Sequence, residues 1–115
     1  MILSLMDQYS LDTVFQALAD PTRRAVIGRL GRGVASVGDL AAPFDMALPS
    51  FMKHVHMLEA AGLIHTHKEG RVRYCEIDEV RLAVVGSWLE EQRAIWESRT
   101  DRLERFVVQK QKELE

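Results

Sequence analysis

The residues best suited to binding an anionic partner are concentrated in residues 48–75. This stretch holds four Lys and Arg against two Glu, and it contains all four histidines of the chain. Lys and Arg neutralise phosphate groups and donate hydrogen bonds to guanine, and Ser can contact either phosphate or base. The pattern predicts a contact surface for double-stranded DNA. Its candidate residues are Pro49, Ser50, Lys53, His54, His56, Lys68, Arg71 and Arg73.

The chain as a whole is weakly acidic. Its 115 residues carry a formal charge of −2, which is not the global signature of a nucleic-acid-binding protein. Local charge is the better guide, because salt screens exposed charges that lie more than about 8 Å apart. The length and the hydrophobic share of 47% suit one globular domain. Residues 1–6 lack the features of a signal peptide, and no apolar run is long enough for a membrane span, so a cytoplasmic location is expected.

The first third of the chain carries signals for two helices. Apolar residues at helical spacing after Ser10 predict a short helix that ends near Asp20. Asp20 followed by Pro21 predicts a new helix start, since Asp accepts hydrogen bonds from free N–H groups and Pro fits the first helical position. We expect Gly31 and Gly33 to end this second helix through the left-handed geometry that glycine adopts.

Two further helices joined by a tight turn are predicted over residues 36–61. Ser36 can cap a short helix that Pro43 ends. A longer helix covers residues 48–61 and closes at Gly62. A short helix, a turn and a second helix form the helix-turn-helix pattern. The residues of the longer helix that are spaced for burial are Phe51 or Met52, Val55, Leu58 and Ala61.

A change from helical to strand periodicity follows. Residues 63–67 and 72–77 are rich in β-branched and aromatic side chains, and they flank a predicted turn at residues 68–71. Within that turn, Gly70 suits a position of positive φ. After this hairpin, Asp78 opens a long helix with apolar residues three and four apart.

The order of these elements predicts a mainly α fold with a small β-hairpin. Specifically, it predicts a winged helix-turn-helix with a long C-terminal dimerisation helix. We interpret residues 1–115 as one domain, with a DNA-binding core over about 11–77 and a dimerisation helix over about 79–115. A helix fits the major groove, and Ser50 and Lys53 share a face near the start of the helix that would enter it.

Several segments of the chain carry a resemblance to one family. They are residues 18–30 (LADPTRRAVIGRL), 40–46 (LAAPFDM), 48–49 (LP), 53–54 (KH), 58–64 (LEAAGLI) and 70–77 (GRVRYCEI). Together they resemble the ArsR-like family of bacterial winged helix-turn-helix repressors, in the family's order. The tail at 88–96 is similar to a subgroup without the cysteine metal site. Two departures are Ala47, where the family often has a Ser or Thr cap, and Met52, where a small polar residue is common.

The resemblance implies a homodimeric transcriptional repressor. Such a dimer binds a palindromic operator through residues 48–61 and the wing at 63–77. In this family the first and last helices form a two-fold interface, which sets the two recognition helices about 34 Å apart. Packing within the chain is an alternative use of the same apolar residues. The dimerisation residues that we expect are Leu11, Val14, Phe15, Trp88, Ile95, Trp96, Leu103 and Phe106.

No cofactor or metal site is expected. The family's thiolate site lies on the helix before the recognition helix, and residues 36–42 contain no cysteine. Another family site uses Asp and His on the last helix, yet no histidine follows His67. Zinc binding by His65 and His67 with a histidine of the recognition helix is conceivable, but histidines facing DNA explain the cluster with less coincidence.

Three classes of function are compatible with the residues. A repressor is favoured, and its effector is unidentified: a small molecule, a partner protein, oxidation of Cys75 or a change in abundance could release it. A winged-helix protein-interaction module without DNA affinity is the alternative, since the net charge is negative and Ala47 and Met52 are unusual. An enzyme is least supported, because the sequence has no Gly-rich phosphate loop, nucleophile elbow or HExxH motif.

Overall fold

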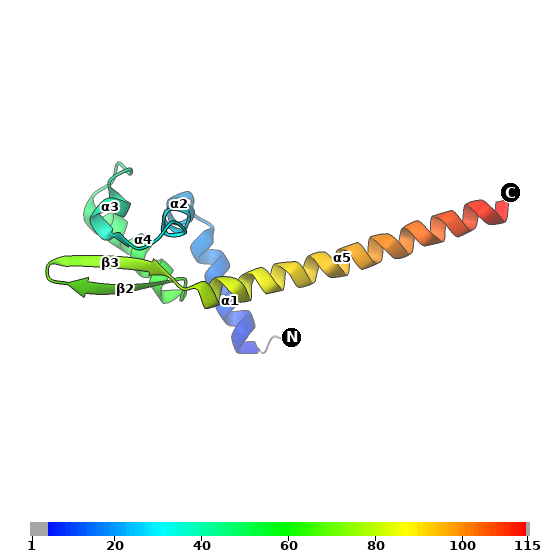
Figure 1. Ribbon diagram of the computed structural model, residues 1–115, viewed down its shortest axis with the longest axis horizontal. Coiled ribbons are helices and arrows are strands. Elements are labelled where there is room, and N and C mark those ends of the chain that lie inside the picture. The colour runs from blue at the N-terminus through cyan, green and yellow to red at the C-terminus, as the bar shows by residue number, and fades with distance from the viewer. Residues whose placement is uncertain (1–4, 115) are drawn as a thin grey trace. The chain divides into compact units, whose positions relative to one another are not determined.

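The computed structural model describes residues 5–114 and divides them into two compact units, the first ending at Leu82 and the second starting at Ala83. Figure 1 shows the five helices and the hairpin. The mainly α fold with a small antiparallel sheet agrees with the prediction. In chain order the elements are α1 (Leu5–Leu18), α2 (Pro21–Leu30), β1 (Ala35–Ser36), α3 (Val37–Ala41), α4 (Leu48–Ala60), β2 (Ile64–Glu69), β3 (Val72–Ile77) and α5 (Glu79–Leu114).

Helices α1 and α2 follow the predicted start and stop signals only in part. Helix α1 starts at Leu5, earlier than the start after Ser10 that the spacing predicted, since no Pro or Gly interrupts the preceding residues. The Asp20 carboxylate accepts a hydrogen bond from the Arg23 backbone N–H at 3.0 Å, which confirms Asp20 as the cap of α2. Gly31 stays right-handed with φ −60°, so the prediction of a left-handed end there was wrong. The positive φ falls at Gly33 instead.

Helices α3 and α4 form the predicted helix-turn-helix. The Ser36 hydroxyl accepts a hydrogen bond from the Asp39 backbone N–H, which confirms Ser36 as the cap of α3. Helix α4 begins without a side-chain cap at Ala47, as the departure from the family pattern predicted. It ends one residue earlier than expected, and Gly62 then adopts a φ of 76°.

The sheet has three strands in the order β1-β3-β2, one more than the sequence predicted. Strand β1 has two residues, too few for any periodicity to show, and it pairs Ala35 with Cys75. The hairpin turn is shorter than expected because Lys68 and Glu69 belong to β2. A φ of 62° at Gly70, the first of only two turn residues, is what a type II′ hairpin requires.

The core of the first unit is built around α4. Phe51, Val55 and Leu58 are fully shielded from solvent, whereas Met52 is half-buried, which resolves the choice between Phe51 and Met52. Helix α4 contacts α1, α2 and β2. The apolar residues that complete this core include Leu11, Val14, Val26, Leu30, Leu40, Leu63, Ile64 and Cys75.

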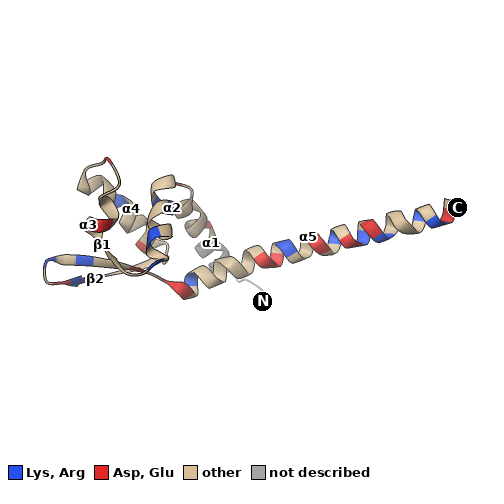
Figure 2. Ribbon diagram, turned by 45° about the horizontal axis from the view of Figure 1, so that its top comes forward, with Lys and Arg blue, Asp and Glu red and all other residues tan. Residues whose placement is uncertain are grey.

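Helix α5 is one unbroken helix of 36 residues, about 54 Å long at 1.5 Å per residue. Its start is capped by Asp78, whose carboxylate accepts a hydrogen bond from the Arg81 backbone N–H at 2.8 Å. Arg93 forms ion pairs with Glu90 and Glu97. Acidic and basic residues alternate along the helix in Figure 2. None of the helices within residues 5–114 combines the length and apolar character that a bilayer crossing needs.

Substitution of two glycines by alanine should have opposite effects on stability. Gly62→Ala should lower the free energy of unfolding by about 1–2 kcal/mol, because L-residues resist a left-handed backbone. The added Cβ would also lie 2.9 Å from the Arg81 Nε atom. A Cβ added at Gly28, inside α2, would have no other atom within 4 Å. Gly28→Ala should therefore raise the free energy of unfolding by about 0.4–1 kcal/mol. Urea denaturation measures both, and equal effects would contradict the assigned backbone geometry.

Candidate nucleic-acid interface

One side of α4 is exposed, and it carries most of the predicted contact residues. Successive helical residues are 100° apart, so five of the exposed residues lie within a sector of about 100° opposite the buried side, whereas the exposed Leu48 and Glu59 lie outside it. Ser50 lies at the edge of this sector and is also exposed. Met57 and Ala60 were not predicted as contacts, although their helical spacing from Lys53 could have indicated them. The residues in the sector are Pro49, Lys53, His56, Met57 and Ala60.

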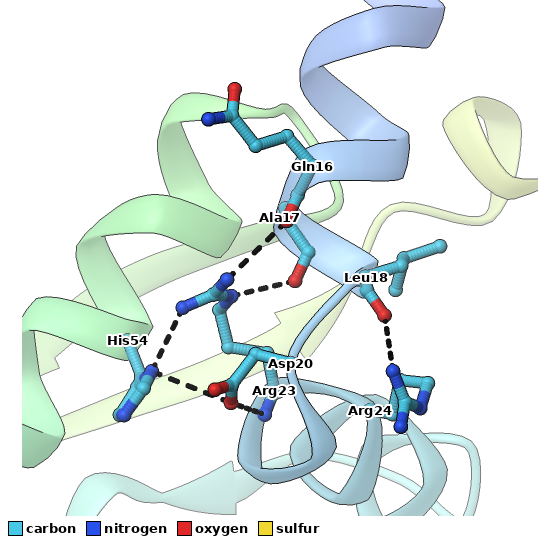
Figure 3. A network of polar contacts seen from close by, with 7 residues as sticks. All are labelled: Gln16, Ala17, Leu18, Asp20, Arg23, Arg24 and His54. Carbon is cyan, nitrogen blue, oxygen red and sulfur yellow. Dashed lines mark hydrogen bonds and ion pairs between the residues drawn. The ribbon is translucent and has the colours of Figure 1, made fainter.

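His54 does not belong to this exposed side. Its ring is half-buried, with the Nδ1 atom 3.1 Å from the Arg23 Nη1 atom and 3.7 Å from the Asp20 Oδ2 atom. Since a guanidinium only donates, the His54 Nδ1 atom accepts the hydrogen bond. Figure 3 shows this ring turned toward Asp20 and Arg23. The structure thus gives His54 a contact within the protein, and its predicted contact with DNA stays a prediction.

Arg23 is the centre of the polar network in Figure 3, a role that was not predicted. Its Nε atom donates to the Ala17 carbonyl at 2.6 Å, and its Nη2 atom donates to the Gln16 carbonyl at 3.3 Å. The last carbonyls of a helix lack partners within the helix. Arg23, which belongs to α2, supplies hydrogen-bond donors to two such carbonyls of α1 and also donates to His54 of α4. One side chain therefore joins three helices.

The hairpin presents basic side chains that oppose each other across the strands. Lys68 and Arg73 are direct partners in the β2–β3 register, and both are exposed. Arg71 is exposed in the turn beside them. Figure 2 shows this basic end of the hairpin. Like charges directly across a sheet are unfavourable, so a nearby anion would relieve their repulsion.

A second polar chain ties the hairpin to α4. The Thr66 hydroxyl donates to the Glu59 carboxylate at 2.6 Å, and the Arg73 Nη1 atom donates to the same hydroxyl at 2.9 Å. Glu59 stands in the last turn of α4, and Arg73 lies on β3. The bonds restrict the hairpin and the guanidinium of Arg73 relative to α4. Sequence periodicity carried no signal for this contact between separate elements.

Comparison with known proteins identifies the family. A helix-turn-helix domain family matches residues 18–67. The transcriptional repressor SdpR of Bacillus subtilis is 32% identical, over 69% of this chain and 88% of its own length. The HTH-type transcriptional regulator Rv2034 of Mycobacterium tuberculosis is 36% identical, over 70% of this chain and 76% of its own length.

A solved structure gives the family its name. The crystal structure of an ArsR family transcriptional regulator is 58% identical, covers 85% of this chain and 98% of its own, and has a TM-score of 0.77. The chain belongs to the ArsR family. The resemblance of residues 18–30 and 58–64 to ArsR-like repressors is thereby confirmed.

In this ArsR family protein the four histidines have different neighbours. His65 is 2.6 Å from the Asp78 carboxylate, and His67 is 3.4 Å from Glu69 and stacks on Tyr74. His54 belongs to the Arg23 network, and His56 is exposed on α4. In the part of the chain that the structure describes, no three His, Cys, Asp or Glu side chains are grouped as metal ligands.

The carboxyl group of Asp20 and the thiol of Cys75 have shifted pKa values with clear causes. The backbone N–H of Arg23 holds the pKa of Asp20 below its usual value, and the positive charge of Arg23 adds to this effect. Burial raises the pKa of the Cys75 thiol, and the charge of Glu59 raises it further. A buried thiol with a raised pKa is a poor nucleophile, which gives the suggested oxidation of Cys75 no support.

Removal of the Asp20 cap should make the protein less stable in a pH-dependent way. Asp20→Ala should lower the free energy of unfolding by about 1 kcal/mol at pH 7, because the first N–H groups of α2 lose their acceptor. The folded pKa of Asp20 is lowered, so its stabilisation is present above the unfolded pKa and disappears as the pH falls through the folded pKa.

The check is urea denaturation of the wild type and the variant from pH 7 down to about pH 3. The difference in the free energy of unfolding between wild type and variant should become smaller as the pH falls. Asp12→Ala serves as control, since Asp12 is exposed on α1 and caps no helix. A difference that stays constant over this range would contradict the role of the charged carboxylate.

Proposed function

We propose that the protein is a sequence-specific transcriptional repressor that binds double-stranded DNA as a homodimer. The observation that carries the proposal is the exposed side of α4, with Lys53 at its centre, on a helix-turn-helix whose hairpin adds three basic residues. Family membership supports it, since SdpR is named a transcriptional repressor. The proposal assigns the protein no catalytic role and places it in the cytoplasm with the DNA.

Helix α4 enters the major groove in this mechanism. Ser50 and Lys53 lie near its start, from which side chains of such helices contact base edges. Lys53 donates to guanine or phosphate, and Ser50 can contact any base. Arg71 and Lys68 of the hairpin contact the neighbouring phosphates, where a narrow minor groove attracts cations. Occupancy of a promoter by the dimer then blocks transcription.

Dimerisation is assigned to the apolar residues of α5. Ile95, Trp96, Leu103 and Phe106 are 50–67% exposed, although large apolar side chains favour burial. Of the three expected residues of α1, only Phe15 is exposed, because Leu11 and Val14 are already buried in the core. Trp88 is half-buried. A second copy of the chain, related by two-fold symmetry, would cover the exposed residues and match a palindromic site.

Charge reversal on the proposed contact surface should weaken DNA binding. Lys53→Glu and Arg71→Glu should each lower the affinity for the chain's own upstream DNA by about tenfold or more, since each loses a charged contact worth at least 1.5 kcal/mol. Each should also reduce the slope of log affinity against log salt by about one. Lys112→Glu, on exposed α5, is the matched control and should bind like the wild type.

The assay is a titration at several salt concentrations with excess unrelated duplex as competitor. Unchanged affinity in both Lys53→Glu and Arg71→Glu would defeat the repressor mechanism. Failure of the wild type to bind any duplex would favour the protein-interaction module instead.

A charge on the apolar residues of α5 should dissociate the dimer. Leu103→Glu should convert the dimer to monomer at micromolar concentration, because burying a carboxylate in an apolar interface costs several kcal/mol. Glu104→Lys alters the neighbouring position, which lies 100° around the helix and is already charged, and should leave the dimer intact. Sedimentation equilibrium distinguishes the two states, and a dimeric Leu103→Glu variant would exclude α5 as the interface.

A further inference from the structure

A groove in the first unit lies between the helix-turn-helix and the hairpin, and the proposed DNA contact explains only the basic part of its lining. Its volume is about 460 Å³, within the range of small-molecule sites, which are about 300–1,000 Å³. It is formed by the start of α3, the start of α4 and the turn end of β3. The lining residues are Ser36, Val37, Gly38, Leu48, Met52, Arg71, Val72 and Arg73.

The lining combines apolar side chains with positive charge. Val37, Leu48, Met52 and Val72 supply the apolar part, and 56% of Leu48 and 41% of Val72 remain exposed. Arg71 and Arg73 supply the charge, and none of the lining residues is acidic. A ligand that fits both properties has an anionic group for the guanidiniums and an apolar body for the rest.

The guanidinium group of Arg73 is oriented by a hydrogen bond within the protein. Its hydrogen bond to the Thr66 hydroxyl fixes one guanidinium nitrogen, and Thr66 is itself held by Glu59. The remaining N–H groups of Arg73 can donate to a carboxylate, and so can those of Arg71 in the turn. Both arginines line the groove together with Leu48 and Met52 from the first half of α4.

We propose that this groove binds a small amphipathic carboxylate, with its anionic group on Arg71 and Arg73 and its apolar body on Leu48, Met52 and Val72. The regulatory consequence rests on the proposed function: the bound carboxylate competes with DNA phosphates for Arg71 and occupies the space beside the start of α4. Such a ligand releases the repressor from DNA. Inorganic phosphate satisfies only the arginines and leaves the apolar lining uncovered, so the site prefers an organic anion.

The test uses naphthalene-2-carboxylate as the probe and the full chain without DNA. Titration is followed through the backbone amide signals of the protein by NMR. The amides of Gly38, Met52 and Val72 should shift together with one dissociation constant. Inorganic phosphate and the uncharged naphthalene-2-carboxamide should each bind at least about tenfold more weakly. Phosphate lacks the apolar body, and the carboxamide lacks the negative charge.

Two pairs of variants test the assignment. Met52→Glu places a carboxylate beside the arginines and should weaken probe binding at least about tenfold, whereas Met57→Glu, on the same helix but outside the groove, should not. Arg71→Gln should also weaken binding, whereas Lys68→Gln on the same hairpin should bind like the wild type. The dispersion of the amide spectrum verifies that each variant is folded. If Met52→Glu unfolds, the comparison of Arg71→Gln with Lys68→Gln tests the site by itself.

The outcomes separate this site from the proposed function. Groove shifts that Met52→Glu or Arg71→Gln abolishes, and that the two controls retain, support the site. Absence of groove shifts, shifts confined to α5, or equally strong binding of phosphate overturns it. Probe binding by a protein that binds no duplex supports the site and defeats the repressor function, and DNA binding that the bound probe leaves unchanged overturns the regulatory role.

Discussion

Burial of one side of α4 is the constraint on which the rest of the first unit depends. Phe51, Val55 and Leu58 are fully shielded, and burial of each such side chain contributes about 1.5–3 kcal/mol. A surface ion pair contributes at most about 1 kcal/mol. The apolar side therefore sets the rotation of α4, and the exposure of Lys53 and His56 on the opposite side follows from it. The polar contacts of Arg23 and Thr66 refine an orientation that packing has already chosen.

Features that depend on neighbouring residues could be predicted from the sequence. Asp20 and Ser36 were identified as caps because a cap bonds to a backbone group only three residues away. Gly62 ended α4 as expected because its positive φ is a property of one residue. The same local logic located the hairpin and the helix-turn-helix, and with them most of the exposed residues of α4.

Features that join distant segments could not be predicted in this way. The β1–β3 pairing and the contact of Thr66 with Glu59 exist only after the chain has folded. The contact of His54 with Arg23 could not be predicted for the same reason, since the two residues are 31 positions apart in sequence. The groove is a further case, because its lining comes from β1, α3, α4 and β3 and from the hairpin turn, which only the fold brings together.

The two-residue turn of the hairpin has a thermodynamic consequence. Strand pairing continues to Glu69 and Val72, so the basic tip carries almost no unpaired backbone that binding would have to order. Ordering a loop costs about 1–2 kcal/mol per residue in conformational entropy. A hairpin that is already ordered at its tip avoids that loss, and more of its electrostatic attraction for an anion is expressed as affinity.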